Sequence, residues 1–224
     1  MTKNHKGIVV IDVGGTNVKV LASGRKDPVK IPSGIKMTPA LMVEEVKKVV
    51  GNSKCIGISI GYPGPVINGK PAVEPHNLGP GWVGFDYKKE FGCSVKIIND
   101  AAMQALGSYE GGRMLFLGLG TGLGSALIVE GVLAPMELAH LPYMKDRTFE
   151  DYVGLRGLER LGKKKWREHV VDVVEKLQNA LVADYVVLGG GNSKHLKLLP
   201  RSVRLGDNAN AFRGGFRLWE DKRQ

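Results

Sequence analysis

Three short glycine-rich turns each follow an apolar run that has the composition of a β-strand. They are Gly14-Gly15-Thr16, Gly120-Thr121-Gly122 and Gly189-Gly190-Gly191. Backbone N–H groups in such a turn can approach a phosphate group closely, because glycine has no Cβ in the way. Thr16 and Thr121 add a hydroxyl donor to the first two turns. One such turn is typical of a tight hairpin, whereas three in this order favour a site for a phosphate chain.

The predicted phosphate site is neither of the two commonest kinds. The sequence has no Gly-x-x-x-x-Gly-Lys-Ser/Thr loop, which would mark a Walker motif. Residues 120–124 also differ from the dinucleotide fingerprint, because a strand rather than a helix is predicted after them.

Two aspartates, Asp12 and Asp100, each stand at the end of a strand-like run. An acid beside a phosphate-binding turn can serve Mg²⁺, directly or through water, or it can bond to the backbone of its own turn. Asp100 opens a predicted helix, where it can be an N-cap. It can also be a general base that accepts the proton of an alcohol attacking phosphorus. The residue types leave both alternatives open for each aspartate.

Glu137 and His140 are three residues apart, a spacing that can place both on one face of a helical turn. The spacing fits equally well a surface glutamate with a partly buried histidine. Glu150, which precedes Asp151, is by itself typical of a surface acid.

The composition is typical of a globular protein that folds in water. The chain has 224 residues, of which 43% are hydrophobic and 24% charged, so disorder over the whole chain is excluded. No apolar stretch approaches the roughly 18 residues of a membrane-spanning helix, and the polar start lacks the apolar core of a secretory signal. Cys55 and Cys93 are too few for a disulfide framework or a four-ligand zinc site. We expect a cytoplasmic protein with reduced thiols and no membrane partner.

The net charge of +10 is concentrated in the last third of the chain. Residues 156–224 contain 15 Lys and Arg against 8 Asp and Glu, which gives +7. This excess fits either a solvated basic surface or attraction to a polyanion, such as a nucleotide, polyphosphate or nucleic acid. The tryptophans are scattered and no aromatic–basic stripe occurs, so nucleic-acid binding is not expected.

Strand and helix patterns alternate along the chain, which predicts an α/β fold. Strand–turn–strand patterns cover 7–22 and 115–129, and the second resembles the first, so two related halves are expected. Single strands are predicted at 55–60, 95–98 and 185–188, and a loop is predicted at 71–85. Helices are predicted at 38–51, 101–109, 166–181, 192–199 and 208–219. Gly111-Gly112 is the expected junction between domains 1–110 and 111–224, and the last helix can pack back on the first domain.

Five segments together resemble the ROK family (repressors, open reading frames and sugar kinases) of the actin-like ATPase superfamily. Val9–Lys19 resembles its first phosphate motif and Leu117–Ser125 its second. Gly57–Val66 is similar to the sugar-side Gly-x-Pro-Gly turn, Ile97–Ala101 to the segment with the catalytic aspartate, and Val186–Gly191 to the adenosine motif. The resemblance covers nearly the whole chain and is strongest to the glucokinases, especially the polyphosphate glucokinase branch.

The resemblance implies two actin-like (ribonuclease H-like) domains around a central cleft. It implies a kinase that uses ATP or polyphosphate, with Mg²⁺ near Asp12, to phosphorylate the 6-hydroxyl of glucose or a related hexose, with Asp100 as general base. The implied sugar contacts are Asn77, Asn99, Glu137, His140 and Glu150. The implied phosphate or nucleotide contacts are Asp12, Gly14, Gly15, Thr16, Asn17, Lys19, Gly120, Thr121, Gly122, Gly189, Gly190 and Gly191.

The chain departs from the family pattern in three respects. Residues 144–149 contain no cysteine where many members carry a zinc motif, so no structural zinc is expected. Met136 and Ala139 stand where glycine usually precedes the Glu and the His, which bears on the shape of the sugar pocket. The chain is also shorter than a typical member, and because its first strand is predicted to begin near residue 7, a repressor's helix-turn-helix is not expected.

Two alternatives to a glucokinase remain open from the sequence. The sugar can be another hexose or an N-acetylhexosamine, with ATP or polyphosphate as donor. The chain can also be a non-catalytic sugar-sensing protein that kept the fold. The family resemblance implies a homodimer in either case.

Overall fold

The computed structural model describes residues 6–51, 54–207 and 209–220. The chain forms two compact units, one from Met1–Met103 with Ala211–Gln224 and the other from Gln104–Asn210. No helix in the described ranges is both long enough and apolar enough to cross a membrane.

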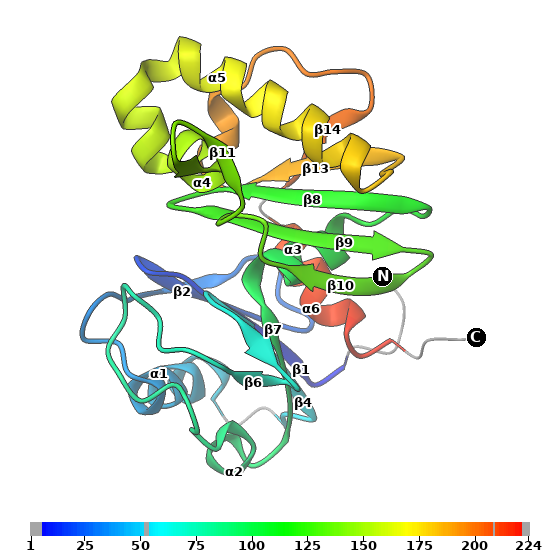
Figure 1. Ribbon diagram of the computed structural model, residues 1–224. Helices are drawn as coiled ribbons and strands as arrows, with labels where there is room; N and C mark the ends of the chain where they lie inside the picture. The colour runs from blue at the N-terminus through cyan, green and yellow to red at the C-terminus, as the bar shows by residue number, and fades with distance from the viewer. Residues whose placement is uncertain (1–5, 52–53, 208, 221–224) are drawn as a thin grey trace. The chain divides into compact units, whose positions relative to one another are not determined.

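The first unit is built on a five-stranded sheet with the order β3-β2-β1-β4-β7 (Figure 1). Its strands are β1 (Ile8–Val13), β2 (Asn17–Ala22), β3 (Val29–Pro32), β4 (Gly57–Tyr62) and β7 (Ser94–Asn99). β1 and β2 form the predicted hairpin, whereas β1, β4 and β7 run parallel. The carboxyl ends of these three parallel strands therefore share one edge, which is where open α/β sheets bind their ligands.

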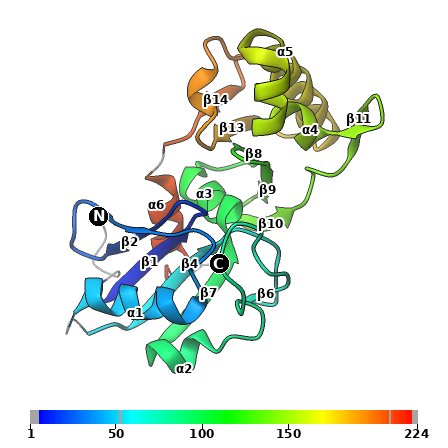
Figure 2. The ribbon, with the colours of Figure 1, turned by 90° about the vertical axis from the view of Figure 1, so that its left-hand side faces the viewer.

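Helices cover both faces of this sheet, because the side chains of β1 alternate. Val9 and Ile11 pack in one core cluster with α1 (Pro39–Val50), and Ile8 and Val10 pack in another with α6 (Asn210–Arg217). The two faces can be followed in Figure 2. α1 begins as predicted, since Thr38 Oγ1 accepts the Leu41 N–H at 3.3 Å and Pro39 is the first helical residue. The remaining elements of the unit are β5 (Val66–Ile67), β6 (Lys70–Pro71), α2 (Tyr87–Phe91) and the start of α3 (Asp100–Ser108).

The second unit repeats this plan with the sheet order β10-β9-β8-β13-β14. Its strands are β8 (Arg113–Leu119), β9 (Leu123–Val129), β10 (Val132–Met136), β13 (Tyr185–Gly189) and β14 (Val203–Leu205). β8 and β9 form the second predicted hairpin, and β13 lies parallel to β8. A small hairpin of β11 (Pro142–Met144) and β12 (Arg147–Thr148) precedes α4 (Phe149–Val153).

The long helix α5 (Leu155–Ala180) supplies most of the helical side of this core. It is interrupted at Gly162, whose φ of 72° is non-helical, and the part after this break buries Trp166, Val170 and Val173. The helix predicted at 192–199 is wrong, because this segment forms only the short 3₁₀ helix η1 (Ser193–His195). Pro200 follows it and limits how far a helix can continue.

Candidate active site

The first glycine turn closes the β1–β2 hairpin and presents its backbone to solvent. The Gly14 N–H donates to the Asn17 carbonyl at 3.1 Å, while Gly15 and Thr16 are exposed. Ser33 supports the turn from behind, since its hydroxyl donates to the Gly14 carbonyl at 2.6 Å and its N–H to the Thr16 carbonyl at 2.9 Å. The sequence analysis did not single out Ser33, because the pairing of β2 with β3 that brings it here is not a local signal.

Asp12 and Lys19 lie opposite each other on β1 and β2, and Lys19 Nζ is 3.1 Å from Asp12 Oδ2. Only 14% of the Asp12 side chain is exposed. The described ranges contain no group of three or more His, Cys, Asp or Glu side chains able to hold a metal ion by themselves. Mg²⁺ at phosphoryl-transfer sites commonly takes one or two carboxylates, with water and substrate phosphate completing the shell. Asp12 fits that kind of site, in which the substrate supplies most of the ligands.

Asn99 and Asp100 stand at the carboxyl end of β7, where α3 begins. Asn99 Oδ1 accepts the Ala102 N–H at 3.1 Å, and its amide donates to the Gly64 carbonyl at 3.1 Å. Asn99 therefore caps the N-terminus of α3 by accepting the N–H of the residue three positions later. Its amide also joins α3 to the Gly-x-Pro-Gly turn at residues 61–64. Asp100 Oδ1 accepts the N–H of its neighbour Ala101 at 2.7 Å.

Two further contacts complete the carboxyl edge of the first sheet. A Cβ on Gly61 of β4 would come within 2.4 Å of Met103 Cε, so glycine leaves room for a side chain of α3 beside the strand. The same Cβ would be in ordinary contact with Asp100 Cα, at 3.5 Å. A Cβ on Gly15 would lie 3.1 Å from Asn77 Cβ, which places the exposed Asn77 against the first glycine turn. The structure thus groups Asp12, Asp100, Asn77 and this turn around one edge of the first unit.

The second glycine turn closes the β8–β9 hairpin and lies against Glu150. The Gly120 N–H donates to the Gly122 carbonyl at 3.1 Å. Glu150 Oε2 accepts the Leu123 N–H at 3.2 Å, and a Cβ on Gly122 would come within 2.2 Å of the same oxygen. Glycine at 122 is therefore required for Glu150 to reach this turn.

The third glycine turn follows β13 and joins the second turn through Asn192. The Asn192 amide donates to the Gly120 carbonyl at 2.8 Å, and its N–H donates to the Leu119 carbonyl at 2.9 Å. Gly190 has a φ of 81°, a conformation that L-residues rarely adopt. Asn192 is a residue that the sequence analysis missed, since only the pairing of β13 with β8 brings it to the second turn.

Glu137 and His140 follow β10 in a turn rather than a helix, with the Leu141 N–H donating to the Leu138 carbonyl at 3.2 Å. The buried Ser125 hydroxyl holds both sides of Glu137: it donates to the Met136 carbonyl at 2.8 Å and accepts the Leu138 N–H at 3.2 Å. Glu137 is thereby fixed by its backbone on both sides.

The structure brings Glu137, His140 and Glu150 together. The Glu150 N–H donates to the Ala139 carbonyl at 3.0 Å, which joins the two segments. Burial raises the pKa of Glu137, His140 lowers it and Glu150 raises it further, so the three groups lie within electrostatic reach of one another. Arg156 Nη2 is 3.4 Å from Glu150 Oε1 and offsets part of the acidic charge. Together they form an acidic cluster with a histidine beside it, in which Glu137 and His140 are exposed and Glu150 is half-buried.

The two unusual residues beside this cluster adopt ordinary backbone conformations. Neither Met136 nor Ala139 is among the described non-glycine residues with positive φ. Met136 packs its side chain against the core of the second unit, and Ala139 is only 3% exposed. The absence of glycine at these positions therefore causes no backbone strain.

Similarity to known proteins settles the family. The model of the ROK family matches residues 8–135, which is more than half of the chain. The chain belongs to the ROK family. The predicted membership of this family is thus confirmed. A curated relative, the polyphosphate glucokinase of Mycobacterium tuberculosis (strain ATCC 25618 / H37Rv), is 29% identical over 210 residues, covering 82% of this chain and 77% of the relative.

Solved structures of ROK proteins share the fold. The inorganic polyphosphate/ATP-glucomannokinase of Arthrobacter sp. strain KM superposes with a TM-score of 0.78 at 22% identity, over 94% of this chain and 97% of that one. A ROK family glucokinase from Streptomyces griseus, in complex with glucose and AMPPNP, has a TM-score of 0.70 at 15% identity, over 95% and 98% of the two chains. The predicted α/β fold of the actin-like class is therefore confirmed.

Proposed function

We propose that this ROK protein is a hexose kinase that transfers a phosphoryl group from polyphosphate or ATP to the 6-hydroxyl of glucose, with Asp100 as general base. Family membership and the curated polyphosphate glucokinase relatives support the coarser statement, a sugar kinase. The observation that carries the finer proposal is the position of Asp100, directly after β7 at the same sheet edge as Asp12 and the first glycine turn.

The proposed chemistry needs few groups, because phosphoryl transfer is driven mainly by positioning and charge stabilisation. As the sugar oxygen bonds to the terminal phosphorus, the bond to the leaving phosphate breaks. Asp100 takes the proton of the hydroxyl, and backbone N–H groups of the glycine turns bind the phosphate oxygens. Mg²⁺ at Asp12 would neutralise developing charge on the donor. Asn77, Asn99, Glu137, His140 and Glu150 are the proposed sugar contacts.

A cluster of cations beside the third glycine turn supports polyphosphate as the donor. Arg167 Nε donates to the His195 carbonyl at 2.6 Å, which holds α5 against η1. Lys163 lies one helical turn before Arg167 and so shares its face, and Lys194 belongs to η1 itself. Loss of hydration contributes most to lowering the pKa of His195, and the three cations lower it further. η1 begins two residues after Gly191, so a phosphate chain leaving that turn would meet the cluster.

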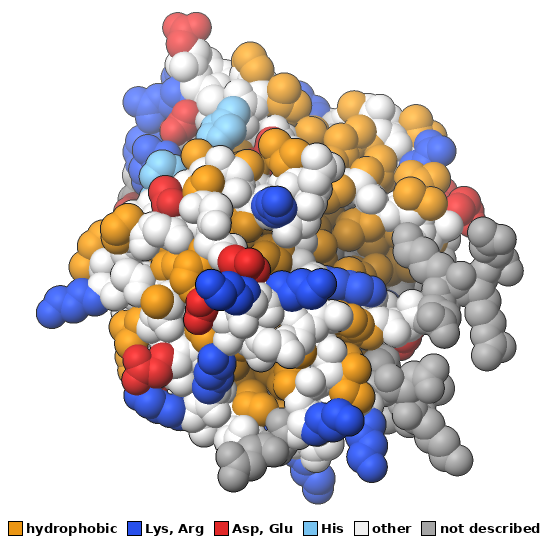
Figure 3. Space-filling model, turned by 90° about the horizontal axis from the view of Figure 1, so that it is seen from below, with side chains coloured by type: hydrophobic (Ala, Val, Ile, Leu, Met, Phe, Trp, Pro, Cys, Tyr) orange, Lys and Arg blue, Asp and Glu red, His pale blue; other side chains and the backbone are white. Residues whose placement is uncertain are grey.

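The break at Gly162 creates a new helix N-terminus beside this cluster, and a helix N-terminus attracts anions. The second part of α5 begins with Lys163, Lys164 and Lys165, all exposed, at the positive end of the helix dipole. Within the described ranges, none of the three forms an ion pair. Further basic side chains lie on the face drawn in Figure 3, where several are next to one another and acidic groups lie beside some of them.

Replacing Lys163, Lys164 and Lys165 together by Gln is expected to raise the KM for long-chain polyphosphate by roughly tenfold, at about 0.5 kcal/mol for each lost surface charge. The KM for ATP should stay within about twofold, because a single nucleotide does not extend along the cluster. Steady-state rates at rising salt provide the measurement. The matched control replaces Lys47, Lys88 and Lys89 in the first unit, and equal effects of both triple variants would contradict a specific donor track.

Acidic pH is expected to weaken sugar use through Glu137. Burial raises the pKa of this carboxyl, so it takes up a proton at higher pH than an ordinary glutamate. Its ionised form accepts hydrogen bonds with both oxygens, and more strongly, whereas protonation turns one oxygen into a donor. The kcat/KM for the sugar should therefore fall as pH drops through the raised pKa. Glu137→Gln should have a low kcat/KM with that acid limb absent. An identical limb in the variant would assign it to another group.

A panel of sugars with each donor distinguishes this proposal from its rivals. Glucose, mannose and N-acetylmannosamine test the sugar, the last because a putative N-acetylmannosamine kinase of Listeria monocytogenes shares the fold with a TM-score of 0.74 at 15% identity. Turnover with glucose supports the proposal. Sugar binding without turnover under any donor would favour a sugar-sensing protein.

A further inference from the structure

His140 and Glu150 stand at the base of one antiparallel arm, which comprises residues 139–150. At the base, the Glu150 N–H donates to the Ala139 carbonyl at 3.0 Å, and the Phe149 N–H to the Leu141 carbonyl at 3.1 Å. Further out, β11 and β12 pair through Pro142 with Thr148 and Met144 with Arg147. A movement of this arm therefore displaces both proposed sugar contacts at once.

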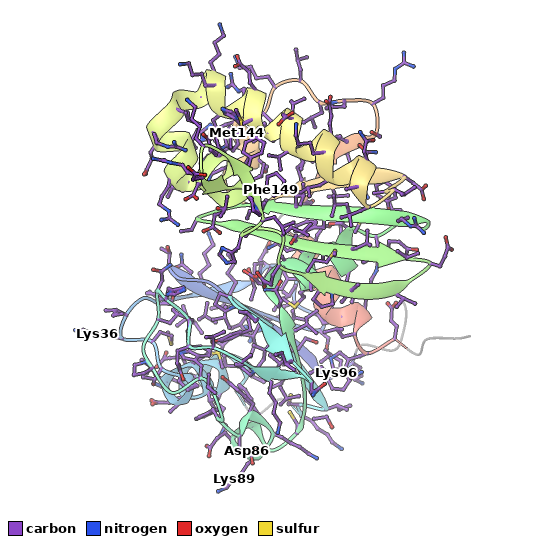
Figure 4. The ribbon with its side chains drawn as sticks, viewed as in Figure 1. Lys36, Asp86, Lys89, Lys96, Met144 and Phe149 are labelled. Carbon is purple, nitrogen blue, oxygen red and sulfur yellow. The ribbon has the colours of Figure 1, made fainter. Side chains whose placement is uncertain are left out.

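Tyr143 anchors the arm to the rest of the second unit. The other residues from 141 to 147 are exposed, whereas Tyr143 is half-buried. Its ring meets Tyr152 edge-on at a centroid distance of 5.0 Å and His169 at 5.7 Å, and it lies 5.3 Å from Phe149. Figure 4 labels Met144 and Phe149, which mark the arm beside α4. These ring contacts pack the arm against α4 and α5 without fixing it by a hydrogen bond.

The hydroxyl of Tyr143 adds directional contacts, because it binds two side chains of α5. It donates to Asp172 Oδ2 at 2.5 Å and lies 3.0 Å from His169 Nδ1. Since its single proton goes to the carboxylate, a second hydrogen bond requires His169 to donate from Nδ1. Lys176 pairs with the other oxygen of Asp172 and fixes the carboxylate in turn.

The charges around this contact keep it intact across the neutral range. Burial and the bond to Asp172 raise the pKa of Tyr143, so the hydroxyl remains a donor. Lys176 and then Tyr143 lower the pKa of Asp172, which remains an ionised acceptor. Burial lowers the pKa of His169, Asp172 and Glu168 raise it, and Arg160 lowers it. His169 is accordingly neutral near pH 7 and can hold the required tautomer.

We propose that Tyr143 is a positioning residue for the sugar site: its hydroxyl ties the arm to α5 and thereby sets the places of His140 and Glu150. This inference rests on the proposed sugar-kinase function. It adds a residue outside the set of proposed sugar and donor contacts, and the loss of its hydroxyl should affect sugar binding selectively.

Tyr143→Phe keeps the ring contacts and removes the hydroxyl. We expect the KM for glucose to rise at least ~5-fold, with kcat and the donor KM within about twofold, because a charged hydrogen bond is lost only from the sugar side. Asp172→Asn should have the same effect, and the double variant should add little to either. Tyr185→Phe is the matched control, since it removes a hydroxyl that accepts the Glu110 N–H at 3.0 Å in the same unit. An unchanged glucose KM in Tyr143→Phe would overturn the proposal.

Amide hydrogen exchange tests the tether without any enzyme activity. In Tyr143→Phe, the Phe149 and Glu150 amides should exchange at least ~10-fold faster, while amides of β8 keep their rates. Unchanged exchange at Phe149 and Glu150 overturns the tether. If the wild-type chain phosphorylates no hexose, the kinase proposal fails, yet faster exchange confined to residues 139–150 still supports Tyr143 as the anchor of the arm.

Discussion

Replacing Asp100 by Asn is expected to lower kcat for hexose phosphorylation by at least ~10²-fold, because an amide cannot accept the proton of the attacking hydroxyl. The amide oxygen can still accept the Ala101 N–H, which Asp100 Oδ1 binds at 2.7 Å, so the start of α3 should persist. The KM values for sugar and donor should change far less than kcat. Steady-state kinetics with saturating donor provide the measurement.

Asp86→Asn is the matched control for this prediction. Asp86 is the N-cap of α2, where its Oδ1 accepts the Lys89 N–H at 3.0 Å, and both residues are labelled in Figure 4. Asn is an equally good N-cap, so this variant should keep the wild-type kcat and stability. A kcat of Asp100→Asn within about threefold of the control would remove Asp100 from the role of general base.

Replacing Gly190 by Ala is expected to lower the free energy of unfolding by about 2–5 kcal/mol, because a left-handed alanine costs about 1–2 kcal/mol and an overpacked contact about 1–3 kcal/mol. Gly190 has a φ of 81°, and a Cβ there would lie 2.4 Å from the Leu119 carbonyl oxygen. That atom is backbone and cannot rotate away. Urea unfolding, followed by the fluorescence of the buried Trp166, measures the loss.

The adjacent Gly191 provides the internal comparison. It is exposed, its φ is not in the left-handed region, and no atom lies within 4 Å of a Cβ placed there. Gly191→Ala should therefore change the stability by less than about 1 kcal/mol. Equal losses in the two variants, or none in Gly190→Ala, would contradict the geometry of the third turn.

Much of the fold was predictable because its signals are local. The β1–β2 and β8–β9 hairpins show glycine turns between β-branched runs, and both form where the sequence predicts them. Thr38, Pro39 and Gly51 mark both ends of α1. Three glycine turns also predicted a phosphate-binding function, since backbone donors require no particular partner in the sequence.

The parts that the sequence did not reveal depend on contacts between distant residues. Asn192 meets the second glycine turn only because β13 pairs with β8. Glu150 has the local appearance of a surface acid, yet the hydrogen bond between residues 139 and 150 brings it beside Glu137. Tyr143 belongs to no motif, and its proposed role depends on a hydrogen bond to Asp172 of α5, 29 residues further along the chain. The grouping of these side chains is a property of packing, which no single segment encodes.

Formation of a phosphorylated sugar, followed by phosphorus NMR, tests the central proposal most directly. Wild type, Asp100→Asn and Asp86→Asn are incubated with glucose, Mg²⁺ and either polyphosphate or ATP. The expected result is glucose 6-phosphate from wild type and Asp86→Asn, faster with polyphosphate, and almost none from Asp100→Asn. No phosphorylated hexose from the wild-type chain with either donor, or equal product from Asp100→Asn, would contradict the assignment of this chain as an Asp100-dependent hexose kinase.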